Sequence, residues 1–503
     1  MEPEGVKNFY LDDTRCLQIA NSLSLSQPSQ MSLTGLFGSA PAFVFSSIAN
    51  LAGEFNHLVI LNDAEDAAYF HNSIENISGA LDLFYFPSSF KTRKNFHLLN
   101  ASHVMLRTEA LTKMTTPTQS LAEPGTFIRK KVLVAHPEAL FEKVVISKTL
   151  SENIIQIKTA DTIDIGQLLL KLDEYGFERS DFVFEPGQYA LRGGIFDIYS
   201  YGNDKPYRFE LFGNEVDSIR IIDPETQLSE RKLLSVSIIP NVDTQFTSEE
   251  RVSLFDFLPA NTVIWLQDQE LCFERLRDNE EELNYFLEHQ STSFTADTGD
   301  GDKQYKKDQS AEDFISADQF LSVLSKCNVL HFGGNSFGAI QEFEFSTKSQ
   351  PAFNRQFDLL LKDLREKEKK KYSIFIFSEN PKQLQRLQTI FDDLKAELVF
   401  NPVSYAIHQG FVDDDFKIVC YTDHEIFQRY HKYRVKQAYN KNKAITLRTL
   451  RELQPGDYVT HIDHGVGVYS GLQKNGCKRQ TAGGGANYIQ RQRRVVCKHQ
   501  LTA

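Results

Sequence analysis

The sequence lacks the features that mark membrane, secreted and disulfide-stabilised proteins. It contains no run of 18 or more apolar residues, and its start has no basic region followed by an apolar one, so we expect neither a membrane span nor a secretory signal. The six cysteines are widely scattered and form no C-x-x-C pair, which argues against a disulfide framework and a zinc site. We therefore expect a cytoplasmic protein with reduced thiols, no membrane contact and no metal.

The common catalytic signatures are absent as well. G-x-S-x-G, H-E-x-x-H and G-x-G-x-x-G do not occur, and no cysteine has an evident histidine partner. With 67 acidic against 55 basic residues the net charge is −12, so the chain as a whole has no electrostatic attraction to nucleic acid. The composition, 41% hydrophobic and 24% charged, is that of a folded protein, and 503 residues are enough for several domains.

Short continuous apolar runs, each followed by a turn signal and helical spacing, occur along most of the chain. Continuous apolar character is typical of strands covered on both faces, as in parallel sheets with crossover helices. A helix start agrees with this, because Asn380 is a capping residue and Pro381 follows at the first helical position. The sequence therefore predicts an α/β fold with strands in the runs 57–63, 131–137, 262–268, 328–334, 372–378 and 417–423.

Residues 187–223 break this rhythm. Strand-like stretches there are separated by turn signals at Gly193–Gly194, at 203–206 and at Gly213–Asn214, which predicts an antiparallel meander inserted in the α/β frame. Arginines and aromatic residues interleave in and just before this segment, namely Arg179, Arg192, Arg208 and Arg220 with Tyr189, Phe196 and Phe209.

These arginines have two interpretations. Arginine beside an aromatic ring on a rigid β surface is typical of a protein-binding hot spot. Alternatively, the arginines pair with acidic residues across the strands and have a structural role. The candidate acidic partners are Asp197, Glu210 and Asp217.

The only candidate for a phosphate-binding loop is residues 35–42 (GLFGSAPA). A working loop needs a lysine for the β- and γ-phosphates and a Ser or Thr hydroxyl for magnesium. Gly35 and Gly38 are present, but those two positions hold Pro41 and Ala42, and proline also removes one backbone donor. We therefore expect a degenerate loop, no catalytic residues, no cofactor and no ATP hydrolysis by this chain.

The C-terminal part begins with a basic segment and ends irregularly. Residues 429–448 are predicted to form a basic linker helix, and residues 455–472 look like the opening of a small β barrel. Residues 475–503 contain six Lys or Arg, no acid and no usable period. They are either a basic tail that binds nucleic acid or an acidic partner, or the product of a frameshift near residues 474–478, which the DNA sequence would decide.

Two ordered stretches resemble a known family. Residues 185–229 (EPGQYALRGGIFDIYSYGNDKPYRFELFGNEVDSIRIIDPETQLS) resemble the UvrB-homology segment of the bacterial transcription-repair coupling factors, the Mfd family. Residues 453–472 (LQPGDYVTHIDHGVGVYSGL) resemble the start of that family's RNA-polymerase-interacting domain, a Tudor-like barrel. The degenerate loop also lies in the family's place, so the resemblance covers the chain up to about Lys474.

The resemblance implies a helicase-like, UvrB-like α/β fold in two halves, with a β-rich UvrA-binding domain inserted between them. The implied parts are a first half (1–147), the inserted domain (148–220), a second half (221–335), a small α/β domain (336–428), the linker helix (429–448) and the start of the barrel with an aberrant tail (449–503). By motif position, Arg179 and Arg192 are assigned to UvrA contact, with Phe196 beside them.

The implied function is recruitment of UvrA to stalled RNA polymerase in nucleotide excision repair. Full-length members displace the polymerase with an ATP-driven double-stranded DNA translocase, so DNA binding would reside in motor domains that this sequence does not contain. The polymerase β subunit is a second implied partner, and an aberrant tail would impair its binding. The alternatives are a UvrB-like nucleotide-dependent repair enzyme and a transcription regulator that uses only the barrel.

Overall fold

A computed structural model describes most of the chain and divides it into two compact units. The first comprises residues 1–222 and 229–439, and the second comprises residues 223–228 and 440–503. The described residues are 4–24, 28–79, 81–92, 95–115, 130–289, 310–333, 341–394, 398–429, 458–461, 465–474 and 493–498. Most of the predicted linker helix lies outside them.

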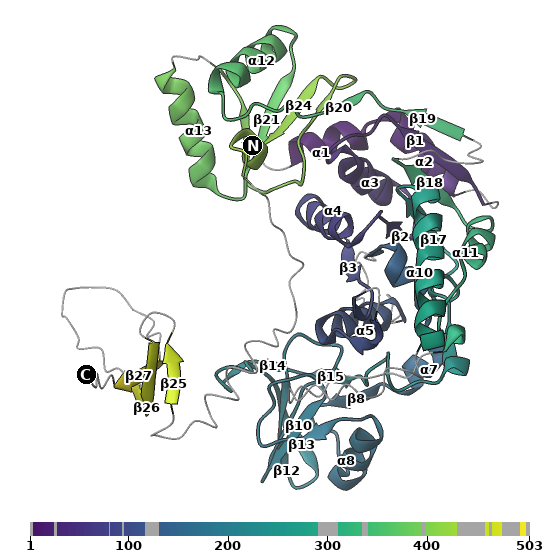
Figure 1. The fold of residues 1–503 in the computed structure, drawn as a ribbon, viewed down its shortest axis with the longest axis vertical. Helices are drawn as coiled ribbons and strands as arrows, with labels where there is room; N and C mark the ends of the chain where they lie inside the picture. Colours follow the sequence, from purple (N-terminus) through teal and green to yellow (C-terminus); the bar gives the residue numbers. More distant parts are fainter. Residues whose placement is uncertain are drawn as a thin grey trace. The chain divides into compact units, whose positions relative to one another are not determined.

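A seven-stranded, entirely parallel sheet forms the centre of the first unit (Figure 1). Its spatial order is β19 (Gln341–Glu344), β1 (Gln30–Thr34), β18 (Val329–Phe332), β17 (Thr262–Leu266), β2 (Asn56–Ile60), β6 (Lys131–Ala135) and β3 (Asp82–Phe86). The four apolar runs predicted between residues 57 and 334 all lie on strands of this sheet. The segments before and after the β-rich insertion therefore build one sheet together.

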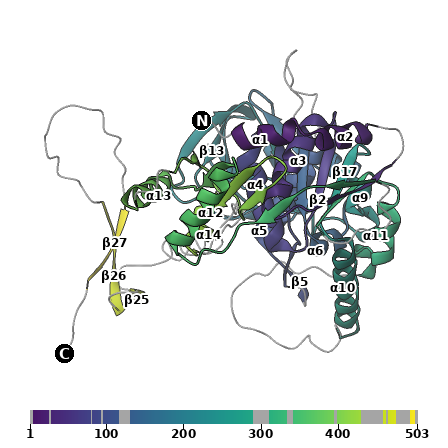
Figure 2. The ribbon, with the colours of Figure 1, turned by 90° about the horizontal axis from the view of Figure 1, so that it is seen from above.

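Helices cover both faces of the sheet, as the continuous apolar strands predict (Figures 1 and 2). Along β2, Leu58 and Ile60 belong to one core, whereas Val59 belongs to the other. The first core includes residues of α5 (Ala101–Thr115), α6 (Pro137–Phe141), α10 (Gln269–His289) and α11 (Ala317–Leu324). The second includes residues of α1 (Glu4–Leu11), α2 (Thr14–Leu23), α3 (Ala40–Leu51) and α4 (Ala64–Ile77).

The predicted meander is confirmed as part of a six-stranded sheet, whose strands from β10 onward are antiparallel. In spatial order its strands are β14 (Ser229–Leu233), β13 (Glu215–Ile222), β12 (Tyr207–Phe212), β11 (Ile195–Ile198), β10 (Gln188–Arg192) and β9 (Glu178–Arg179). α8 (Ile165–Glu174) shares a core with this sheet, and β8 (Ile155–Lys158) pairs with β15 (Ser235–Ile238). The sheet continues past residue 220, the predicted end of the inserted domain. The last strand, β14 (SERKL), could not be predicted because it is exposed and carries little apolar signal.

A five-stranded mixed sheet, with its helices, forms a part that we call the small α/β domain (residues 347–429). Its strands are β20 (Thr347–Ser349), β23 (Phe411–Asp413), β24 (Ile418–Thr422), β21 (Ser373–Phe377) and β22 (Asn401–Val403), with α12 (Phe357–Lys369), α13 (Pro381–Asp393) and α14 (Asp423–Ile426). The last two predicted apolar runs are its parallel neighbours β21 and β24. Asn380 caps α13 as predicted, since its side chain accepts the N–H of Lys382 at 3.0 Å.

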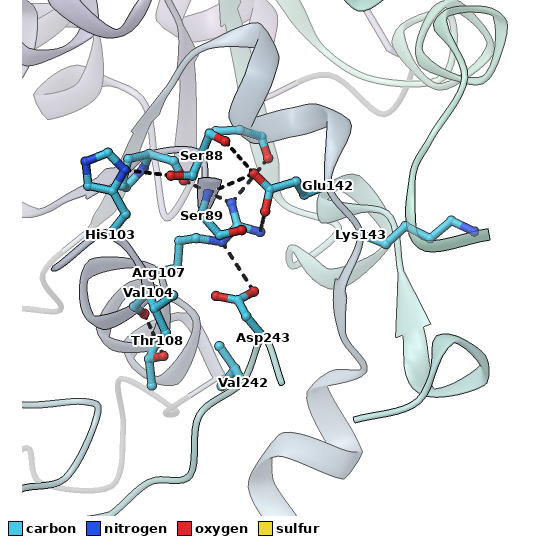
Figure 3. Close-up of polar contacts among 12 residues, drawn as sticks. Ser88, Ser89, His103, Val104, Arg107, Thr108, Glu142, Lys143, Val242 and Asp243 are labelled. Carbon is cyan, nitrogen blue, oxygen red and sulfur yellow. Dashed lines mark hydrogen bonds and ion pairs between the residues drawn. The ribbon is translucent and has the colours of Figure 1, made fainter. Parts of the chain in front are cut away.

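Two short paired strands connect the β-rich insertion to the parallel sheet. β7 (Val144–Val145) on the way in pairs with β16 (Arg251–Val252) on the way out. The fully buried Arg107 on α5 lies between the carboxylates of Glu142, 3.5 Å away, and Asp243, 3.6 Å away (Figure 3). One buried cation therefore contacts both passages of the chain. The other short elements are β4 (Phe90–Thr92), β5 (Asn95–Leu99), α7 (Ser147–Glu152), η1 (Ser248–Glu250), α9 (Leu254–Phe257) and η3 (Ala311–Asp313).

The second unit contains a three-stranded antiparallel sheet. In the segment predicted to open a small barrel, β25 (Tyr458–His461) pairs antiparallel with β26 (Gly465–Lys474). A third strand, β27 (Arg493–Lys498), pairs with β26 and lies in the tail for which the sequence showed no usable period. Among the residues that the structure describes, no helix is both long and apolar enough to cross a bilayer.

Candidate functional site: the outer face of the six-stranded sheet

The six-stranded sheet has a core face and an outer face. Strand alternation and the cross-strand register place Phe196, Phe209 and Ile219 in one row, and these side chains are fully buried. The adjacent row, on the opposite face, contains Asp197, Arg208 and Arg220, and Arg192 lies on the same outer face. The sheet thus presents a row of charged side chains away from the core that it shares with α8.

Asp197 is the centre of this outer face. Its carboxylate has no exposed area, although it lies on the polar side of the sheet. Arg208 donates to both of its oxygens, at 2.7 and 2.8 Å, and Nη2 of Arg192 donates to Oδ2. The hydrogen bond with Asp197 is the main reason that the pKa of Arg208 is raised. Two arginines therefore cover one buried carboxylate, which fixes the position of both guanidinium groups.

Arg192 is held in place on three sides. Besides Asp197, it donates to the backbone carbonyl of Asp181, and its guanidinium carbon lies 4.3 Å from the centre of the Phe182 ring. Phe182 is 36% exposed, and 31% of the Arg192 side chain remains exposed. A guanidinium stacked on an exposed ring is a pre-ordered contact surface, because little side-chain entropy remains to be lost on binding.

A second ion pair lies further along the same face. Nη2 of Arg220 is 3.1 Å from Oε2 of Glu210, which also accepts the hydroxyl of Ser218 at 2.6 Å. The hydrogen bond from Ser218, followed by the charge of Arg220, lowers the pKa of Glu210. The structural interpretation of the arginines is thus confirmed for the pairs with Asp197 and Glu210. What sets Arg192 apart is its stacking on an exposed aromatic ring.

Phe196 is not on this outer face. Its ring is 0% exposed and lies 5.5 Å from the ring of Phe209 in the core. Tyr189 is likewise buried, at 4% exposed. Direct contact of Phe196 with a partner is incompatible with this arrangement, because its side chain packs in the core. The aromatic side chain beside Arg192 is instead Phe182, which lies in the irregular segment before β10 and has no periodic signal in the sequence.

Arg179 is exposed on β9 at the edge of the sheet, and its register partner is Tyr189 on the core side. Burial and a hydrogen bond with Asp173 raise the pKa of Tyr189, and the charge of Arg179 opposes this shift. The structure therefore does not bring Arg179 and Arg192 together on one face. Within the described residues no carboxylate forms an ion pair with Arg179.

The degenerate loop lies between β1 and α3, where the sequence places it. Gly35 and Gly38 have positive φ values of 70° and 56°. Pro41 lies in the first turn of α3, and Ala42, at the position of the missing hydroxyl, is 1% exposed in the core. The two side chains that would hold phosphate and magnesium are thus replaced by groups suited to packing and to helix initiation.

Comparison with known families shows which domains two segments of the chain are similar to. Residues 155–243, which include the whole six-stranded sheet, match the model of the UvrB interaction domain. Residues 453–490 match the model of the CarD-like/TRCF RID domain. The two matched segments contain the two motifs from which the resemblance was recognised.

Curated proteins that match the chain include transcription-repair-coupling factors. The protein of Bacillus subtilis (strain 168) is 26% identical over 396 residues, which are 64% of this chain and 32% of that protein. The protein of Staphylococcus aureus (strain bovine RF122 / ET3-1) is 22% identical over 522 residues, 89% of this chain and 43% of that protein. The chain is thus a relative of the N-terminal part of these proteins, which confirms the resemblance, and it spans less than half of their length.

Proposed function

We propose that this chain is the N-terminal, non-motor part of a transcription-repair coupling factor and recruits UvrA to stalled RNA polymerase in nucleotide excision repair. In this proposal the parallel sheet is the degenerate, helicase-like body in two halves, and the second unit is the start of a Tudor-like, polymerase-binding barrel. The chain acts by binding other proteins and does not itself hydrolyse ATP.

The observation that supports UvrA binding most directly is the pre-ordered pair of Arg192 and Phe182. The pair lies within the segment that matches the UvrB interaction domain, on the face opposite the core. Buried Asp197 holds the guanidinium, so the charged and aromatic surface exists before any partner arrives. Arginine and aromatic side chains that are fixed in advance are typical of residues that dominate binding energy. Arg179 at the sheet edge provides a second, separate cationic contact.

Replacing Arg192 by alanine is expected to weaken UvrA binding by about 1–3 kcal/mol, the effect of truncating an interface hot spot. Folding should change by less than about 1 kcal/mol, because the pair is partly exposed and Arg208 still neutralises Asp197. Isothermal titration calorimetry with purified UvrA measures the affinity, and a thermal melt measures the folding.

Arg220→Ala is the matched control for this experiment. Arg220 lies on the same face, has the same side-chain exposure of 31% and also pairs with an acid, but no aromatic ring in the described part of the chain is stacked on it. We expect this variant to bind UvrA nearly as the unaltered chain does. Equal losses for both variants would mean that UvrA senses only the charge of this face. An unaltered affinity for Arg192→Ala would assign Arg192 a structural role alone.

Polymerase binding is expected to be weak or absent in this chain. A contact made by adding a strand needs an ordered edge of regular register. The register between β26 and β27 shifts between Tyr469 and Leu472, and the tail that contains β27 has the aberrant composition noted above. A pulldown with the polymerase β subunit, run beside one with UvrA, is expected to recover UvrA only. Strong capture of the β subunit would contradict the expectation that the aberrant tail impairs polymerase binding.

A further inference from the structure

Four N–H groups of the degenerate loop already have acceptors within the chain. In a working phosphate loop these groups point at phosphate oxygens. Here the N–H of Phe37 donates to Oγ1 of Thr347 at 2.8 Å, and the N–H of Ser39 donates to the carbonyl of Gln409 at 3.1 Å. The N–H groups of Ala40 and Ala42 donate to carbonyls of the loop itself, at 3.1 Å each.

Both external acceptors come from the small α/β domain. Ser39 and Gln409 form a reciprocal pair, because the N–H of Gln409 donates back to Oγ of Ser39 at 3.0 Å. Ser39 occupies the N-cap position of α3, yet its side chain makes no capping bond there. A serine at such a position normally accepts an N–H of its own helix. The Ser39 hydroxyl instead accepts the N–H of Gln409 in the small α/β domain.

The backbone of residues 345 and 410 lies so close to Gly35 and Gly38 that neither position has room for a side chain. A Cβ on Gly38 would lie 2.6 Å from the carbonyl oxygen of Gly410, and one on Gly35 would lie 1.9 Å from that of Phe345. Both glycines also have positive φ, which other residues rarely adopt. The glycines of this loop therefore permit close approach of another backbone, as they would permit close approach of a phosphate.

The segment that enters the loop is fixed by its own domain. The N–H of Gly410 donates to Glu425 at 2.6 Å, and its carbonyl accepts the N–H of Gln350 at 3.0 Å. Glu425 also accepts the hydroxyl of Thr422 at 2.6 Å. These contacts fix the backbone of residues 409–410 within the small α/β domain. Its conformation therefore does not depend on contact with the loop.

We infer that the degenerate phosphate loop is a docking socket for the small α/β domain, with residues 409–410 and Thr347 as its built-in ligand. The carbonyl of Gln409 and the hydroxyl of Thr347 satisfy donors that phosphate oxygens would otherwise take. The loop thereby fixes the small α/β domain on the parallel sheet, and nucleotide cannot enter while the segment is docked. This role is independent of UvrA binding, which involves a different sheet.

Hydrogen exchange of the full chain tests the socket directly. Ser39→Ala and Thr347→Val each remove one side-chain partner, and we expect amides of residues 405–411 to exchange roughly three- to tenfold faster in each variant. Ser316→Ala is the control, because Ser316 caps α11 outside the socket, and it should leave these amides unchanged. Unchanged exchange in both socket variants would overturn the inference, as would equal acceleration by the control.

Restoring the missing side chains provides a second test. In the double variant Pro41→Lys with Ala42→Thr, we expect no saturable binding of a fluorescent ATP analogue in the presence of magnesium, because the N–H groups of Phe37 and Ser39 remain bonded to the small α/β domain. Saturable, magnesium-dependent binding with residues 405–411 still protected would show that the loop is open, and would overturn the inference. If the double variant does not fold, the exchange experiment decides alone.

Discussion

Replacing Arg107 by methionine is expected to lower the free energy of unfolding by about 3–5 kcal/mol, because it leaves two buried carboxylates without their cation. Glu142 is 5% exposed and Asp243 is 4% exposed, so water cannot substitute for the guanidinium. Methionine keeps the length of the side chain, which limits the contribution of a cavity. The single tryptophan, Trp265, is buried in β17 and reports unfolding of the sheet by its fluorescence in urea.

Neutralising the carboxylates tests whether charge is the cause. Arg107→Met combined with Glu142→Gln and Asp243→Asn should regain most of the lost stability, since buried ion networks are often replaceable as a set. Arg220→Met, at the partly exposed pair with Glu210, should cost less than about 1 kcal/mol and serves as the control nearer the surface. A single Arg107→Met variant that unfolds at the same urea concentration as the unaltered chain would contradict the prediction.

The Arg107 cluster also affects how the β-rich insertion is positioned. Glu142 precedes β7, where the chain enters the insertion, and Asp243 follows β15, where it leaves. Ser88 and Ser89 hold Glu142 at 2.7 and 2.8 Å, so the carboxylate is itself fixed (Figure 3). One arginine thus ties both ends of the insertion to α5. These contacts are suited to holding the outer face of the six-stranded sheet in a fixed orientation toward a partner.

Most of the α/β frame could be predicted from the sequence because its strands are continuous apolar runs. All six predicted runs are strands, and the hairpin at Gly193–Gly194 is present. The charged strand β14 and the two-residue strand β9 were missed, since neither has an apolar pattern. The Arg107 cluster joins residues more than 130 positions apart and the socket joins Ser39 to Gln409, and no local pattern encodes contacts of that separation.

The face on which Phe196 lies can be predicted from the hairpin turn. A two-residue turn at Gly193–Gly194 makes Arg192 and Ile195 direct partners across the hairpin. Phe196, the next residue, must then point to the opposite face, and the register confirms that it pairs with Leu191. Alternation alone thus excludes Phe196 from the face of Arg192. Phe182 could not be found this way, because it lies in an irregular segment.

Replacing Asp197 by alanine is expected to cost about 2–3 kcal/mol in local stability and to weaken UvrA binding at least as much as Arg192→Ala. Truncating a buried, hydrogen-bonded charge costs about 2–5 kcal/mol, and the lower part of this range applies because Arg192 and Arg208 both reach solvent. Native-state hydrogen exchange of the β11 and β12 amides should accelerate roughly 30- to 150-fold. Calorimetry with UvrA measures the loss of affinity.

The comparison with Asp197→Asn and Asp217→Ala separates charge, shape and general effects of the substitution. Asparagine keeps the shape but not the charge, so it should retain part of the stability while Arg192 loses its ionic anchor. Asp217 is exposed on β13 of the same sheet, and its removal should change stability by less than about 0.5 kcal/mol. If Asp197→Ala destabilised the sheet yet left UvrA affinity intact, Arg192 would not need its buried anchor, and the pre-ordered surface would be the wrong explanation for binding.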